Sequence, residues 1–418
     1  MKPTVTELAL TLGRWGVTPL NEATQKKVVE TLVGWSVRTR TPLRIESYMD
    51  APVDRNTLQV LVERAHKSDT VTAVARIEPR SDRWKILHEM GVREAVFEVP
   101  VSDEAARARF TPLGSDRSPG FAAEMARDAM VHGVTPEIAL VDICRAKEET
   151  VSELIAAVQR EAVARSVECR WRLVDDTGLG NPLPGSKTPR SLARWIRWME
   201  REFSIASSSI SVQASDLRGL ALANALAGVQ EKTGAATSLF GLGIRAGWAA
   251  TEVLMLHLGE RGAGIPELME LHGLLGTEDV RDSFRPVSGR HVWQMLGGTT
   301  PENLSSKWDA QLACDPKQLT GIEPEPLLTS LSGHAGLLHL MHENMGNRQF
   351  DSDDQTTLKI SSKIEAEYAS GRQQPVGWYE IEPLIRATSL WEEDPASESA
   401  DANSKNTESS AEDPDIYG

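Results

Sequence analysis

The sequence predicts an α/β fold, a (β/α)8 barrel in which eight parallel strands close into a ring covered by helices. Short β-rich runs alternate with helical patterns over about the first 260 residues, which matches the number of elements and the usual length of this fold. The predicted strands are 5–12, 43–46, 71–77, 94–99, 137–143, 169–174, 209–213 and 237–241. An open, doubly wound parallel sheet is the alternative arrangement of the same elements.

The helices predicted between these strands share apolar positions spaced three and four residues apart. They are Glu22–Val37, Asn56–Ala65, Phe121–Val131, Glu149–Ala164, Pro189–Glu202, Gly219–Glu231 and Ala249–Leu258. Beyond about residue 265 no further strand is predicted, and 266–274, 302–312, 327–344 and 357–371 have helical patterns. We therefore expect the barrel to occupy 1–265 and an appended helical subdomain to occupy 266–390.

The last 28 residues, 391–418, contain nine acidic residues and one lysine, and most of the others are Ser, Asn and Ala. Such a composition buries too little apolar surface to offset the entropy of ordering the chain. We expect a disordered acidic tail, which carries −8 of the net charge of −15.

Composition excludes several classes of partner. A net charge of −15 disfavours nucleic acid, which is bound through clustered Lys and Arg. There is no run of 18 uncharged apolar residues, and the N-terminus has no hydrophobic signal sequence, so we expect a cytoplasmic protein without a membrane partner. The three cysteines, Cys144, Cys169 and Cys314, are far apart in the sequence and are predicted to be reduced thiols.

Several motifs follow the predicted strands in a fixed order. They are Asp142-Ile143-Cys144-Arg145, Leu173–Pro182 (LVDDTGLGNP), Gly219–Asn224 (GLALAN), Gly241–Gly247 (GLGIRAG), Pro286–Arg290 (PVSGR), Leu331–Gly336 (LSGHAG) and Glu365–Arg372 (EAEYASGR). Over about 390 residues this pattern resembles homocitrate synthase, isopropylmalate synthase and hydroxymethylglutaryl-CoA lyase, a family of metal-dependent barrels with a pyruvate carboxyltransferase-type domain. The resemblance implies the barrel fold and chemistry that joins or cleaves an acyl-CoA and a 2-oxo acid.

The resemblance also implies a divalent metal at the barrel mouth, held by an Asp on the first strand, an HxH pair on the seventh and often an Asn after the eighth. In this chain those positions are Ala9, Gln213, Ser215 and Trp248, and Gly13 stands where the family has a catalytic Arg. Because a bulky apolar ring cannot coordinate a cation, we expect the family's metal site to be lost and no cofactor to be bound. Trp15 and Trp248 suggest a filled or reshaped pocket.

Other polar residues resemble family positions at the mouth and are the candidate substrate-binding residues: Glu46, Arg76, Asp142, Arg145, Asp175, Gln213, Ser215 and Arg245. The charged members can contact a ligand, or they can form a buried ring of ion pairs that closes the barrel; we favour the ring. Glu46, Asp142, Asp175 and Asp216 offer oxygen atoms to Mg²⁺ or Mn²⁺, as a less favoured possibility.

Three weaker features are interpreted as structural. His339 and His342 lie three residues apart but lack a third metal ligand nearby in the sequence. Gly185-Ser186-Lys187-Thr188 lacks the spacing of a phosphate loop and is predicted to be a turn before a helix. Cys144 has no His close in the sequence to activate its thiol and is predicted to be a packed side chain.

Two functions remain open at this point. The first is a synthase-like enzyme, an acyltransferase or lyase, that acts on an acyl-CoA such as acetyl-CoA and a 2-oxo acid with a remodelled, metal-free site. The second is an inactive member that binds a small carboxylate or an acyl-CoA, or that regulates a partner synthase. The resemblance also implies a homodimer or a pair with a homologous subunit.

Overall fold

The computed structural model describes residues 3–11, 20–49, 51–78, 83–110, 115–243, 246–258, 265–277, 285–296, 315–322, 325–329, 332–345 and 355–387. The predicted tail, the helix expected at 302–312, Trp15, Arg245 and Cys314 lie outside these residues. The chain divides into two compact units, one made of 1–292 with 316–322 and one made of 293–315 with 323–418. Each unit is described by itself.

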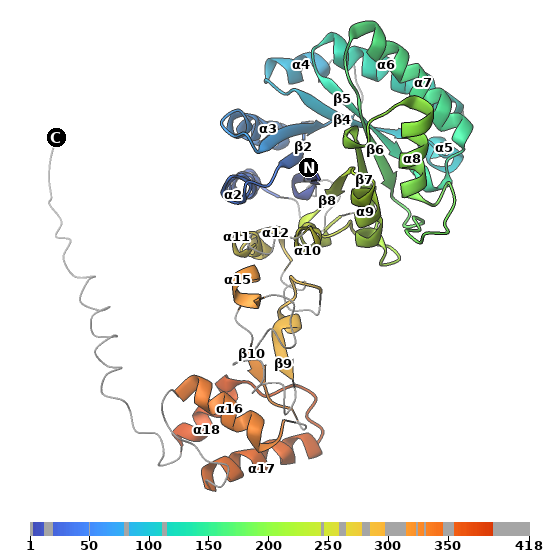
Figure 1. Cartoon of the computed structure of the whole chain (residues 1–418). Coiled ribbons are helices and arrows are strands. Elements are labelled where there is room, and N and C mark those ends of the chain that lie inside the picture. The colour runs from blue at the N-terminus through green and yellow to red at the C-terminus, as the bar shows by residue number, and fades with distance from the viewer. Residues whose placement is uncertain are drawn as a thin grey trace, which may run out of the picture. The chain divides into compact units, whose positions relative to one another are not determined.

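Eight parallel strands close into a barrel in the first unit (Figure 1). They are β1 (Val5–Glu7), β2 (Leu43–Tyr48), β3 (Val71–Arg76), β4 (Glu94–Pro100), β5 (Thr135–Val141), β6 (Arg170–Asp175), β7 (Ile210–Ala214) and β8 (Gly234–Thr237). The ring closes at β1, where Val5 lies opposite Leu43 of β2 and Ala235 of β8. The predicted barrel is confirmed, and the open sheet is excluded.

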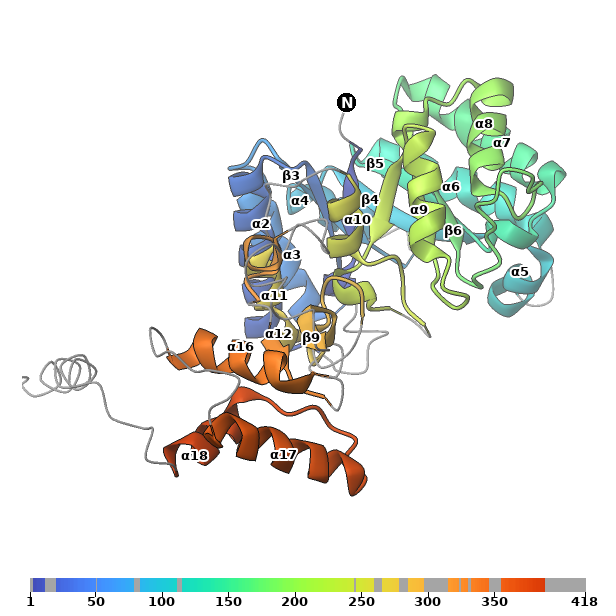
Figure 2. The ribbon, with the colours of Figure 1, turned by 60° about the horizontal axis from the view of Figure 1, so that its bottom comes forward.

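Helices surround the strands (Figure 2). They are α2 (Glu22–Thr39), α3 (Pro52–Ala65), α4 (Arg83–Glu89), α5 (Asp103–Phe110), α6 (Ser118–Val131), α7 (Glu148–Arg165), α8 (Leu192–Phe203), α9 (Ala221–Gln230) and α10 (Thr251–His257). Side-chain caps start two of them, since Asn21 accepts from Thr24 N at 2.9 Å and Ser191 from Arg194 N at 3.4 Å. The buried residues of α8 are Leu192, Trp195, Ile196 and Met199, which form one apolar face.

Two strand predictions were misplaced at their carboxyl ends. β1 ends at Glu7, because the Glu7 carboxylate accepts from Ala9 N at 2.9 Å and a 3-10 turn, η1 (Ala9–Thr11), follows. β8 ends at Thr237, and the predicted run 237–241 instead forms the turn η5 (Leu239–Gly241), in which Phe240 has a φ of 56°. Side-chain hydrogen bonds hold both turns, from Glu7 to Ala9 N in η1 and from Glu7 and Glu252 to Leu239 N and Phe240 N in η5. Local periodicity carries no information about such contacts.

After the barrel helices, α11 (Pro266–Met269), α12 (His272–Leu275) and α15 (Pro316–Thr320) belong to the first unit. The second unit holds β9 (Gln294–Leu296) and β10 (Glu325–Leu327), paired in parallel, with α16 (Gly333–Met345), α17 (Gln355–Ala369) and α18 (Trp378–Arg386). Buried Leu340, Ile360 and Ile381 join the three helices in one core. The expectation that no strand follows residue 265 is therefore wrong, because three-residue strands are too short to show a period of two.

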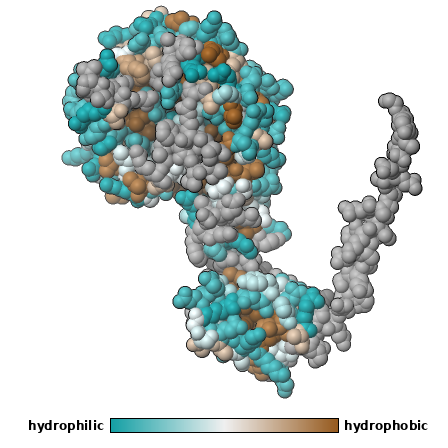
Figure 3. All heavy atoms as spheres, turned by 180° about the vertical axis from the view of Figure 1, so that it is seen from behind, coloured by the Kyte–Doolittle hydropathy of each residue, from teal (hydrophilic) through white to brown (hydrophobic). Residues whose placement is uncertain are grey.

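Among the described residues, no helix combines the length and the apolar composition needed to cross a bilayer. The face seen in Figure 3 is mostly hydrophilic, with apolar residues in small separate groups. Scattered exposed apolar residues of this kind are normal for a folded protein in water.

Candidate functional site at the barrel mouth

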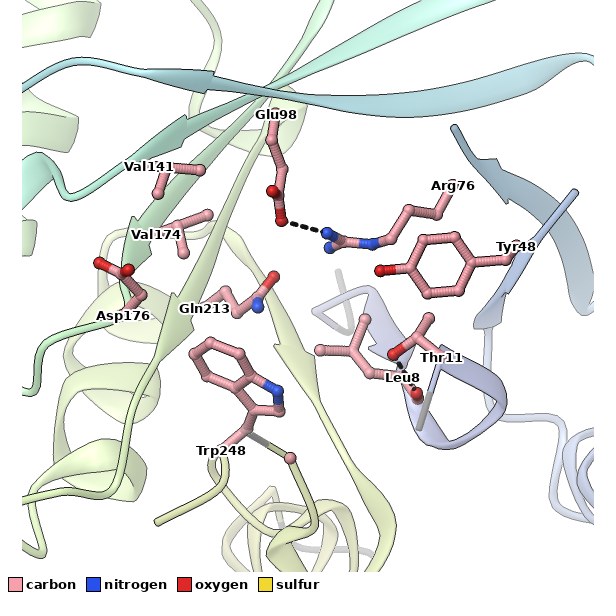
Figure 4. Close-up of a pocket in the computed structure, with 11 residues that line it drawn as sticks. Leu8, Thr11, Tyr48, Arg76, Glu98, Val141, Val174, Asp176, Gln213 and Trp248 are labelled. Carbon is pink, nitrogen blue, oxygen red and sulfur yellow. Dashed lines mark hydrogen bonds and ion pairs between the residues drawn. The ribbon is translucent and has the colours of Figure 1, made fainter. Parts of the chain in front are cut away.

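A pocket of about 90 Å³ lies at the mouth of the barrel, where the strands end and where barrels of this class hold their ligands (Figure 4). Its lining comes from the turns after β1 and β8, from the strands between them and from the loop after β6: Leu8, Thr11, Tyr48, Arg76, Glu98, Val141, Val174, Asp176, Gln213, Gly243 and Trp248. Apolar side chains form part of the wall, and Arg76, Glu98, Asp176 and Gln213 supply polar groups. The pocket therefore suits a small polar molecule or one end of a larger one.

A chain of alternating charges runs through the barrel interior and ends in this pocket. Arg44 contacts Glu94 at 2.7 Å and Glu137 at 2.6 Å, and Arg172 contacts Glu137 and Glu46, both at 2.7 Å. Arg76 pairs with Glu46 on one side and with Glu98 on the other. Every guanidinium group lies between two carboxylates, which offsets the cost of burying the charges.

Asp142 and Arg145 form a separate pair beside the mouth. The Asp142 side chain is fully buried, and it accepts from the Ser102 hydroxyl and from Arg145 Nε at 2.7 Å. Asp142 has a left-handed backbone conformation with a φ of 64°, which starts the turn η3 (Ile143–Arg145). The Arg145 side chain is 36% exposed. This pair fixes a turn, and among the described residues no ion pair or side-chain hydrogen bond joins it to the interior charges.

Asp175 organises the loop after β6. Its carboxylate accepts from Gly180 N at 2.7 Å and from Leu179 N at 3.0 Å, and its side chain is fully buried. Asn224 of α9 donates to Gly180 O at 3.1 Å on the other side of the same loop. Of the predicted ring, the pairs Glu46–Arg76 and Asp142–Arg145 form, while Asp175 binds the backbone of its own loop. Among the described residues no ion pair joins these groups into one ring, and Arg245 lies outside them.

Gln213, at the carboxyl end of β7, and Trp248, in the turn after η5, both line the pocket (Figure 4). Gln213 Oε1 accepts from Arg172 Nη1 at 3.1 Å. Trp248 is held by an isolated bridge to Ser215 and packs against Gly243, where a Cβ would lie 2.4 Å from the indole ring. Only glycine fits at position 243 beside this tryptophan. Ser215 is buried, and its hydroxyl has no hydrogen-bond partner in the described part of the chain.

Polar residues thus lie at the mouth of a closed eight-stranded barrel, and this arrangement can be compared with known proteins. The HMGL-like family model matches residues 49–280, more than half of the chain. The chain belongs to the HMGL-like family.

Two curated relatives of this HMGL-like protein are synthases. 2-Phosphinomethylmalate synthase of Streptomyces hygroscopicus is 26% identical over 393 residues, which cover 91% of this chain and 88% of the relative. Citrate (Re)-synthase of Clostridium kluyveri is 21% identical over 353 residues, which cover 81% of this chain and 77% of the relative. The likeness to both extends well beyond the barrel.

Among solved structures, an HMG-CoA lyase from Acinetobacter baumannii, in complex with coenzyme A and 3-methylmalate, superposes with a TM-score of 0.52 at 17% identity. The match covers 66% of this chain and 92% of the lyase. At this identity the superposition supports the barrel fold alone.

The residues of this HMGL-like chain at the expected metal positions do not fit a divalent cation. Ala9 has no donor atom, is fully buried and does not line the pocket; Leu8 and Thr11 do. The Gln213 oxygen is already bound to Arg172, and the Trp248 nitrogen carries a hydrogen and has no lone pair to give a cation. Among the described residues, no group of three His, Cys, Asp or Glu side chains could hold a metal ion.

Sequence reasoning missed two buried carboxyl groups that position the turn after β8. Glu7 accepts from Leu239 N at 2.9 Å and from the Thr251 hydroxyl, and Glu252 accepts from Phe240 N at 2.9 Å. Burial raises the pKa of both carboxyl groups to about 7. Arg285 donates to Phe240 O, and the His272 ring stacks on Phe240 at 3.6 Å between centroids. These contacts hold the left-handed Phe240.

The features that the sequence analysis interpreted as structural, around Cys144, Lys187 and the two histidines, do not line the pocket. Cys144 is buried, and burial together with Asp175 and Asp142 raises the pKa of its thiol well above the usual range. Lys187 lies in the turn before α8, as predicted, and its carbonyl accepts from Arg190 N and Ser191 N. His339 and His342 lie on α16 in the second unit. Four charged residues of the barrel interior were not identified from the sequence: Arg44, Glu94, Glu137 and Arg172. Charged residues inside a predicted strand already indicate buried ion pairs.

Proposed function

We propose that this HMGL-like protein joins the acyl group of an acyl-CoA to the keto carbon of a 2-oxo acid at the barrel mouth. The observation that carries the proposal is the likeness to 2-phosphinomethylmalate synthase, which extends over 91% of this chain. A shared barrel alone would support far less, since one fold serves many activities. This relative and citrate (Re)-synthase are both synthases, one of 2-phosphinomethylmalate and one of citrate.

The proposed condensation has three steps before the thioester is hydrolysed. A base removes a proton from the carbon next to the thioester, that carbon forms a bond to the keto carbon, and the keto oxygen takes up a proton to become a hydroxyl. Water then hydrolyses the thioester and releases CoA. Asp176 lines the pocket and is partly buried, and we assign its carboxylate as the base.

The test is to incubate the purified full-length chain with acetyl-CoA or propionyl-CoA and, separately, pyruvate, oxaloacetate or 2-oxoglutarate. CoA release is followed with a thiol reagent, and products are identified by mass. Each reaction is run after chelation and again with added Mg²⁺, Mn²⁺ or Zn²⁺. The proposal expects CoA release that depends on the 2-oxo acid. Release that is no faster than thioester hydrolysis with every pair would contradict it.

A second function is favoured by one observation, namely that the expected metal positions offer no set of ligands. On this reading the chain binds a carboxylate or an acyl-CoA without catalysis, or regulates a partner synthase. Saturable binding of a 2-oxo acid without CoA release supports it. Because the two readings predict the same binding and different turnover, the CoA assay separates them.

A further inference from the structure

We infer that the mouth pocket binds the oxygen atoms of a 2-oxo acid through three N–H groups, from Arg76, Gln213 and Trp248, in place of a metal ion. The inference rests on the proposed function, because it names the atoms by which that substrate is held. All three side chains line one pocket and are more than nine-tenths buried, with exposed fractions of 7%, 3% and 7%.

The Gln213 amide presents its nitrogen to the pocket. A guanidinium group only donates hydrogen bonds, so the atom that faces Arg172 at 3.1 Å must be the amide oxygen. This contact fixes the orientation of the amide. Nε2 has no hydrogen-bond partner among the described residues, and as a primary amide it can donate two hydrogen bonds.

The Trp248 indole supplies a second donor. Its ring packs against Gly243 and lines the pocket, and Nε1 has no partner within the described ranges of the chain. The bridge to Ser215 ties its backbone to the end of β7, so the ring is held on the same side of the barrel as Gln213 (Figure 4). An indole N–H can donate but cannot accept.

Arg76 supplies the third donor and the positive charge. Its Nε and Nη1 are paired with Glu46 and Glu98, which leaves Nη2 without a partner among the residues described. In Figure 4 the guanidinium group projects into the same pocket from β3. Nearby carboxylates raise the pKa of Arg76 further above its already high value, so the group stays charged.

The chemistry of these groups selects an oxygen-rich ligand. Three N–H donors favour carbonyl or carboxylate oxygens as their partners. A ketone that becomes an alkoxide during the proposed reaction gains negative charge on one oxygen, and fixed N–H groups stabilise such a charge. Because two of the three donors are neutral and Arg76 is balanced by two carboxylates, the pocket recognises hydrogen-bond geometry more than net charge.

Calorimetry on the full chain in chelator-treated buffer tests the inference. The probes are three matched pairs that differ in the keto oxygen: pyruvate and propionate, oxaloacetate and succinate, and 2-oxoglutarate and glutarate. We expect at least one 2-oxo acid to bind about tenfold or more tightly than its partner. We expect Trp248→Phe, which keeps the ring, and Gln213→Glu, which keeps a contact to Arg172, each to reduce that preference severalfold.

Trp198→Phe is the matched control, because Trp198 packs against Trp195 and Phe203 on α8, away from the pocket. It should bind like the wild type. The inference is overturned if no 2-oxo acid is preferred, if both mouth variants keep the wild-type preference, or if binding appears only with added metal. Preference without CoA release would contradict the proposed function alone. CoA release at wild-type KM by both variants would contradict the inference alone.

Discussion

Arg172 contacts Glu137 at 2.7 Å in the barrel interior, where the exposed fractions of the two side chains are 0% and 1%. Glu137 also binds Arg44, and the two guanidinium groups hold the pKa of its carboxyl far below the usual range. Through Nη1 Arg172 contacts Glu46 and donates to Gln213 Oε1. One buried side chain thus links the charges of the interior to the amide that faces the pocket.

Replacing Arg172 with Met should destabilise the protein by about 3 to 5 kcal/mol, because Glu46 and Glu137 would each lose a buried partner. Urea unfolding followed by circular dichroism measures the change. The double variant with Glu137→Gln should lose less than the sum of the single variants, since the pair interacts directly. A loss below about 1 kcal/mol for Arg172→Met would show that the interior chain contributes little.

Arg145→Ala should cost less than Arg172→Met, about 1 to 2 kcal/mol, because Arg145 is 36% exposed and solvent screens its pair. Asp142 also keeps the hydrogen bond from the Ser102 hydroxyl. The same unfolding experiment gives the comparison. An equal or larger loss for Arg145→Ala would mean that the Asp142 pair, and not the interior chain, carries the main buried charge interaction.

Glu7 and Glu252 should make stability fall as pH rises. Burial raises both folded-state pKa values from 4.5 to about 7, so the contribution is complete below pH 4.5 and is lost as pH rises through 7. We expect the free energy of unfolding to fall by up to about 3 kcal/mol per carboxyl over this interval. Glu252→Gln should flatten the dependence, and Glu89→Gln, at an exposed position of α4, should not. The same slope in wild type and Glu252→Gln would refute this assignment.

If Asp176 is the base of the proposed condensation, Asp176→Asn should lower kcat by about 100-fold or more. The KM for the 2-oxo acid should change little, because the three N–H donors remain. Steady-state CoA release measures both constants. A variant that keeps wild-type kcat would show that Asp176 is not the base. It would not test the assignment of the three N–H donors.

Deleting 391–418 should leave the melting temperature and the oligomeric state nearly unchanged, because a segment of this composition contributes little folding energy. Thermal melting and sedimentation of both forms give the answer. A clear fall in melting temperature would mean that the acidic segment docks on the folded chain.

The sequence was sufficient for the barrel because alternation of strands and helices is a local property that repeats eight times. It was insufficient for the carboxyl ends of β1 and β8. Glu7, at the end of β1, binds Leu239, which is 232 residues further along the chain, and Phe240, after β8, has a left-handed backbone. The same limit applies to β9 and β10, which are too short to show periodicity.

At the site, Glu46, Arg76 and Gln213 were identified from the sequence and do lie in or beside the pocket network. Their partners were not, because pairing across a barrel joins residues such as Arg172 and Glu46 that are 126 positions apart by their numbers. Asp142 and Asp175 were placed correctly at strand ends. Their carboxylates bind groups of the turn or loop that follows each strand, and they do not face the pocket. Pairing with a second copy or a homologous subunit stays a prediction that sedimentation can test.

The most direct measurement is a crystal structure of the chelator-treated full chain with the 2-oxo acid that binds best by calorimetry. The account predicts the keto oxygen or a carboxylate oxygen within about 2.7 to 3.2 Å of Gln213 Nε2 and Trp248 Nε1, with Arg76 Nη2 on the same ligand. A ligand bound elsewhere, or one that enters this pocket only together with a metal ion held by protein side chains, would contradict it.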